Sequence, residues 1–107
     1  MLAGALIRRA QAAGGFATVV VKGDPISGVI LVQALEKGQE MGLFERVSDY
    51  AGGYRLAPCG PSAQVLHDSG PGALASYIER RRRSDPDLWV IELDIAQAER
   101  FAAETIC

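Results

Sequence analysis

One segment, Glu79–Leu93, constrains the fold of this chain more than any other. After Glu79 come four consecutive arginines, Arg80–Arg83, then an acidic proline turn, and last an apolar stretch that carries the only tryptophan. The residue before a proline disfavours the helical conformation, so a helix leading into this segment must end at or before Asp85. The segment therefore predicts a helix end, a turn containing Pro86, and a buried strand that places Trp89 in the core.

The four arginines cannot share one face of a helix, because four successive residues cover about 300° of arc. The apolar stripe of this helix, formed by Leu74, Tyr77 and Ile78, continues at helical spacing onto Arg81. Arg81 is therefore predicted to be structural and to lay its methylene groups over the core. Arg83 is predicted to point towards water.

The partner of Arg81 is expected to come from the turn or from the strand that follow it. Asp85 and Asp87 offer carboxylates, and Trp89 offers an aromatic face on which a guanidinium can stack. The neighbouring cations also favour the negative end of the helix dipole, by a few tenths of a kcal/mol each.

The exposed part of this corner is the best candidate for a binding surface. The candidate residues are Arg80, Arg82, Arg83, Asp85 and Asp87. Arg8 and Arg9 extend this surface if the N-terminal helix packs beside the arginine helix. A protein partner is favoured over nucleic acid, because the net charge of −2 makes the whole chain a poor trap for phosphate backbones. Nucleic-acid binding is a weak third alternative, because the chain has only two lysines and no run of exposed aromatic residues on which bases could stack.

The first half of the chain reads as a helix followed by strands. Residues 3–13 have apolar residues at helical spacing, and Gly14 and Gly15 supply the stop, since glycine adopts the left-handed C-terminal conformation without penalty. Residues 16–21 and 29–33 are strands by their β-branched content, and the turn 22–28 between them predicts a hairpin. Both strands are apolar at nearly every position, which predicts the centre of a sheet covered on both faces.

The second half contains two more strands, at residues 42–47 and 54–56, and then a loop from 57 to 72. Pro71 fits the first position of a helix that runs from about 72 to 83. A last strand covers residues 89–93. The tail, residues 96–104, has the composition of a helix, but whether it is helix or strand stays open.

Together these elements predict one α+β domain spanning residues 1–107. We expect an antiparallel sheet of about five strands with two helices packed on it. The order is helix, four strands, helix, strand and tail, because successive strands joined by short links favour antiparallel pairing.

No arrangement of residues amounts to a catalytic or metal-binding signature. Cys59, His67 and Asp68 lie in one loop, so a small hydrolase or transferase is an alternative if the fold brings them together. Two cysteines and one histidine are too few for a typical zinc site, and no cofactor is expected. Gly23 and Gly28 have the spacing of a phosphate-binding loop, but the lysine and hydroxyl residues that such a loop needs are missing, so they are turn residues.

The chain also lacks the features of an exported or membrane protein. No stretch approaches the roughly 20 apolar residues needed to span a bilayer, and the charges at Arg8 and Arg9 follow the apolar N-terminus instead of preceding it. Cys59 and Cys107 fit no disulfide framework, which favours a reducing compartment. We expect a cytoplasmic protein.

Several blocks of the sequence resemble a known family. They are Ala5–Ala17, Lys22–Pro25, Gly28–Val32, Tyr77–Arg81 and Ser84–Glu92. Together they are similar to the small bacterial family catalogued as domain of unknown function 1491, and residues 85–90 are the most specific part. The resemblance covers nearly the whole chain. It implies a compact, cytoplasmic bacterial protein and brings no activity, cofactor or catalytic residue.

We therefore expect a non-enzymatic accessory or protein-interaction module. An edge strand left open, together with the high apolar content of 49%, makes a homodimer a reasonable form for it.

Overall fold

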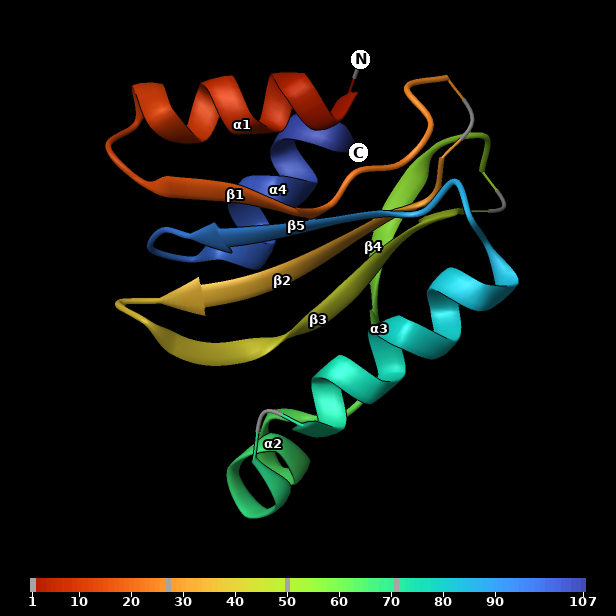
Figure 1. Cartoon of the computed structure of the whole chain (residues 1–107). Coiled ribbons are helices and arrows are strands. Elements are labelled where there is room, and N and C mark those ends of the chain that lie inside the picture. The colour runs from red at the N-terminus through yellow and green to blue at the C-terminus, as the bar shows by residue number, and fades with distance from the viewer. Residues whose placement is uncertain (1, 27, 50, 71) are drawn as a thin grey trace.

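A five-stranded sheet with helices on both faces makes up the chain (Figure 1). The computed structural model describes residues 2–26, 28–49, 51–70 and 72–107. The strands are β1 (Phe16–Val21), β2 (Ile30–Glu36), β3 (Gln39–Ser48), β4 (Tyr54–Cys59) and β5 (Trp89–Asp94). The helices found in these residues are α1 (Leu2–Ala12), α2 (Ala63–Ser69), α3 (Gly72–Ser84) and α4 (Ala98–Ile106).

The sheet is mixed, and the predicted purely antiparallel sheet is wrong. Its strand order is β1-β5-β2-β3-β4, with β5 antiparallel to β1 and parallel to β2. The predicted hairpin between residues 16–21 and 29–33 is wrong for the same reason, since β5 lies between those two strands. The connection from β4 to β5 carries α2 and α3, and such a long crossover lets β5 return parallel to β2.

The position of β1 also corrects the prediction from its composition. Strands β5 and β2 occupy the middle of the sheet and are buried at most positions, as a strand covered on both faces should be. Strand β1 is equally apolar but lies at the edge, where Phe16 is 74% exposed. The prediction that both apolar runs are central strands is therefore correct for β2 and wrong for β1.

Two hydrophobic clusters cover the two faces of the sheet. On one face, α1 and α4 pack on Val32 and Ile91, and Leu6 of α1 is fully buried there. On the other face, α3 contributes Leu74 to a smaller cluster around Val90. Figure 1 shows α1 and α4 together on one side of the sheet and α3 on the other. The sheet therefore lies between the two terminal helices, α1 and α4, and the helix α3 that carries the arginine run.

The helix predictions are confirmed for α1 and α3, and the number of helices is corrected. The described residues hold four helices instead of two, because α2 forms inside the predicted loop and the tail forms α4. Gly14 ends α1 in the left-handed conformation, with φ at 84°. Pro71, predicted to open the arginine helix, lies outside the described residues.

A tight turn, unrecognised in the sequence, joins β2 to β3. Lys37 and Gly38 both have positive φ, at 52° and 79°. The carboxylate of Asp94 accepts hydrogen bonds from both of their backbone N–H groups, at 2.9 and 2.8 Å. The end of β5 therefore holds the turn of the neighbouring hairpin in place.

Residues Gly23, Asp24 and Gly28 of the loop after β1 pack directly against the acidic turn that precedes β5. Asp24 donates its backbone N–H to the Asp87 carbonyl at 3.0 Å, and the Trp89 indole donates to the Asp24 carbonyl at 2.8 Å. Side chains at Gly23 or Gly28 would collide with the Asp87 carbonyl. Both glycines are therefore required by this close backbone approach, beyond the turn role predicted for them.

Within the described residues, none of the helices has the length and apolar character that a bilayer-crossing segment needs.

Candidate functional site

Arg81 is the centre of a polar cluster between α3 and the sheet. One terminal nitrogen, Nη1, donates to Glu45 Oε1 at 2.9 Å and to the Tyr77 hydroxyl at 2.8 Å. The Arg81 and Glu45 side chains are 24% and 25% exposed, so the ion pair is largely shielded from water. The hydrogen bond to Glu45 is the main reason that the pKa of Arg81 is raised.

The predicted half-buried position of Arg81 is confirmed, and its predicted partners are wrong. Asp85, Asp87 and Trp89 follow Arg81 in the chain, but the carboxylate that it contacts comes from β3. Arg81 lies on the inner side of α3, as the apolar stripe predicts, and therefore faces the sheet. The strand beneath it is β3, which carries Glu45. The turn after α3 leads away to β5.

The other arginines of the run are solvated. Arg82 and Arg83 lie 4.0 and 3.8 Å from the carboxylate of Glu79, and all three side chains are more than half exposed. The Arg80 guanidinium carbon lies 6.0 Å from the centre of the Tyr77 ring. Such loose and exposed pairs contribute little stability, which leaves the three cations open to solvent.

The two aspartates of the corner organise the turn. The Asp85 carboxylate accepts the backbone N–H of Asp87 at 3.1 Å, and its carbonyl accepts the N–H of Leu88 at 3.2 Å. Asp87 offers its carbonyl to Asp24, as described above. Pro86 is exposed at the tip. Asp85 and Pro86 therefore have a structural role in the connection from helix α3 to strand β5.

Arg8 and Arg9 are not joined to this corner, because α1 and α3 cover opposite faces of the sheet. Arg9 donates to the Thr105 hydroxyl at 2.9 Å and lies over the ring of Phe101, 5.2 Å from its centre. The enlarged cationic surface that required side-by-side helices does not form.

Cys59, His67 and Asp68 are not assembled into a catalytic group. Cys59 ends β4 beside Tyr77, and burial is the main cause that raises the pKa of its thiol. His67 and Asp68 are exposed on α2, where the Asp68 carboxylate accepts a hydrogen bond from Gln64 at 3.1 Å. Among the described residues no hydrogen bond links Cys59 to either of them. A thiol whose pKa is raised is also a poor nucleophile at neutral pH.

The described residues also contain no cluster of three or more histidine, cysteine, aspartate or glutamate side chains able to hold a metal ion.

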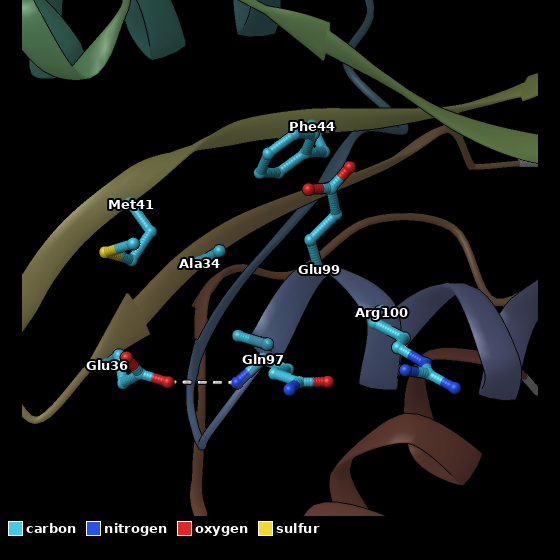
Figure 2. A pocket seen from close by; sticks show the side chains of 8 residues that line it. Ala34, Glu36, Met41, Phe44, Gln97, Glu99 and Arg100 are labelled. Carbon is cyan, nitrogen blue, oxygen red and sulfur yellow. Dashed lines mark hydrogen bonds between the residues drawn. The ribbon is translucent and has the colours of Figure 1, made fainter.

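A small pocket of about 350 Å³ opens between the start of α4 and the β2–β3 hairpin (Figure 2). Its walls are mainly apolar and include Met41 and Phe44. Glu36 at the rim accepts the backbone N–H of Gln97 at 3.1 Å, and Glu99 lies in the first turn of α4. Carboxylates in these positions satisfy and stabilise the helix N-terminus. The two carboxylates of this pocket are therefore explained by the fold.

These elements define an α+β fold with a five-stranded mixed sheet. In the described residues no hydrogen bond joins Cys59 to His67 or Asp68, the three residues of the alternative hydrolase or transferase reading. The chain belongs to the family described as protein of unknown function DUF1491, whose model matches residues 1–103. This finding confirms the resemblance seen in the sequence.

Solved structures of similar proteins agree with this membership. A crystal structure of a DUF1491 family protein from Caulobacter crescentus CB15 is 33% identical, covers 94% of this chain and 88% of its own, and has a TM-score of 0.72. An NMR structure of a DUF1491 family protein from the same organism is 36% identical, with coverages of 86% and 79% and a TM-score of 0.64.

A solution structure of a protein from A. tumefaciens is 32% identical, covers 89% of this chain and 82% of its own, and has a TM-score of 0.62. These relatives are bacterial, and the family has no assigned function. A comparison with curated proteins finds no match.

Proposed function

We propose that this protein is a non-enzymatic interaction module that self-associates through the edge strand β1. The observation that carries the proposal is the exposure of apolar side chains on this strand. Phe16, Val19 and Val20 are all exposed, and no other strand among the described residues pairs with the outer side of β1. An open apolar edge offers both backbone hydrogen-bonding groups and apolar surface to a further strand.

The opposite edge of the sheet lacks these properties. Strand β4 carries Arg55 and Pro58, and a charge and a proline are the devices that commonly prevent strand addition. Strand β1 contains neither a charged residue nor a proline. Its one irregularity is a bulge between Val19 and Val21, which lies in its pairing with β5.

A second copy of the chain is the partner that this strand fits. When two β1 strands pair antiparallel about a two-fold axis, each position meets a position of the same strand. Because β1 carries no charge, this pairing sets no like charges opposite each other. A charged peptide would find no complementary charge on the strand.

Matched lysine variants test the proposal by sedimentation velocity. Val20 on β1 and Val65 on α2 have similar exposed fractions, 47% and 43%. We expect the wild-type protein to sediment as a dimer at about 100 μM and Val20→Lys to sediment as a monomer, because lysine on an edge strand opposes pairing. Val65→Lys should keep the dimer.

Circular dichroism spectra of the variants show whether the fold is intact. A monomeric wild-type protein at this concentration contradicts the proposal, and so does a dimer that Val20→Lys and Val65→Lys weaken equally.

We also propose a second contact surface, which binds an acidic protein partner. It is the corner formed by Arg80, Arg82, Arg83, Asp85 and Asp87. The loose pairing of its arginines with Glu79 supports this role. Elution from a heparin column measures how well the corner attracts a polyanion. We expect a triple variant with Gln at positions 80, 82 and 83 to elute at clearly lower salt than the wild type. Equal elution would remove the corner from consideration.

We also propose that the protein acts in the cytoplasm. The free state of Cys59 and Cys107 supports this setting, since reducing compartments keep thiols unpaired.

A further inference from the structure

A groove separate from β1 and from the pocket beside α4 lies at the end of the sheet where α1 begins. It has a volume of about 600 Å³, which is within the range of small-molecule sites. The beginning of α1 forms one wall, and residues 24–26 with Gly28 form the other. The side chain of Trp89, itself nearly buried, reaches the groove from the start of β5.

Arg46 is a fixed cation in this groove. Its Nε donates to the carbonyl of Ile106 at 2.6 Å, and its guanidinium carbon lies 3.5 Å from the centre of the Tyr54 ring. These contacts immobilise the side chain before any ligand arrives and leave its terminal NH₂ groups as further donors. A guanidinium held in this way loses little entropy when it binds an anion.

Arg8 adds a second positive charge from α1. Its side chain is exposed, and no ion pair within the described part of the chain neutralises it. Asp24 also lines the groove, and its carboxylate accepts the backbone N–H of Ile26 at 2.8 Å. With two guanidinium groups and one carboxylate, the groove carries a net positive charge.

Apolar side chains surround these charges. Leu2, Tyr54 and Ile26 all line the groove and are exposed, and Ile26 is exposed to 96%. Isolated exposed apolar residues are ordinary, but three around one charged groove form a combined surface. Such a surface fits a ligand that has both an anionic group and a hydrocarbon part.

We propose that this groove binds a small amphipathic carboxylate. The carboxylate is held by the Arg8 and Arg46 guanidinium groups, and the hydrocarbon chain lies against Leu2, Ile26 and the ring of Tyr54. Charged hydrogen bonds from guanidinium to carboxylate supply the selectivity for the anion. This site is independent of the self-association proposed for β1.

Trp89, the only tryptophan, gives a direct signal for this binding. Its fluorescence can be followed while the full chain is titrated at low salt with octanoate, octanol or octylammonium. We expect saturable binding of octanoate, at least tenfold weaker binding of octanol, and no saturable response to octylammonium. Backbone amide NMR shifts should locate the bound octanoate at Asp24, Ile26 and Gly28 and at the beginning of α1.

The test variant is Arg8→Gln, because Arg46 also ties β3 to the C-terminal helix and its removal could disturb the fold. We expect this change to weaken octanoate binding about tenfold, as the loss of one charged hydrogen-bonding partner does. Arg83→Gln on α3 is the matched control and should bind octanoate as the wild type does. Equal binding of octanoate and octanol, equal loss in both variants, or no saturable signal at millimolar octanoate would overturn the proposal.

Discussion

At the scale of single residues, Arg81 is the side chain whose contacts tie α3 to the sheet. It is linked to Glu45 on β3 and to Tyr77 within its own helix. We expect Arg81→Ala to lower the free energy of unfolding by about 1–2 kcal/mol, since it leaves a shielded carboxylate without its partner. Arg83→Ala should change it by less than about 0.5 kcal/mol, because this side chain is solvated. Urea denaturation midpoints of the two variants test this difference in stability. Equal midpoints would contradict the structural role of Arg81.

The half-buried thiol of Cys59 gives a prediction about pH. Burial raises its pKa above the usual 9.0, which means that the folded state favours the neutral thiol. The stability linked to this group is present below pH 9 and is lost as the pH rises through the folded-state pKa. We expect the stability difference between wild type and Cys59→Ala to shrink between pH 8 and pH 10. A difference that stays constant across this range would show that the thiol does not titrate differently on folding.

The residue scale also shows where sequence reasoning ends. The apolar strand predicted correctly that Trp89 lies in the core, and the helical stripe predicted correctly that Arg81 lies on the inner side of its helix. It could not supply Glu45 as the partner, because that contact joins residues 36 positions apart. Such a partner depends on which strand lies beneath the helix, and helical spacing carries no information about that.

At the scale of elements, the loop from Lys22 to Gly28 and the turn before β5 act as one unit. Because a Cβ atom at Gly23 would collide with the Asp87 and Leu88 backbone, we expect Gly23→Ala to destabilise the fold by about 1–3 kcal/mol. Gly72 has open space around its Cβ position, so Gly72→Ala should be neutral or slightly stabilising. Thermal melts measure both, and an unchanged melting temperature for Gly23→Ala would refute the close approach.

Element positions followed from local patterns, whereas pairing did not. Strand β1 was predicted with its observed bounds, Phe16–Val21, from β-branched residues alone. Its partner β5 follows about 70 residues later, and the short loop after β1 favoured the wrong neighbour. Helix α2 was missed because its proline- and glycine-rich surroundings resembled a loop.

At the scale of the whole molecule, the two sheet edges and the groove are the features that family membership leaves unexplained. The arginines of the run divide into a structural Arg81 and an exposed corner. The unprotected edge at β1 contrasts with the protected edge at β4, and this contrast is the basis for the proposed dimer.

Amide hydrogen exchange at two protein concentrations, about 5 μM and about 300 μM, tests the β1 interface most directly. Strand pairing protects amide hydrogens that would otherwise exchange with solvent. We predict that outward-facing amides of β1 become more protected at the higher concentration, while those of β4 do not change. Protection of β1 that is the same at both concentrations, in a protein that sediments as a monomer at each, would contradict the account.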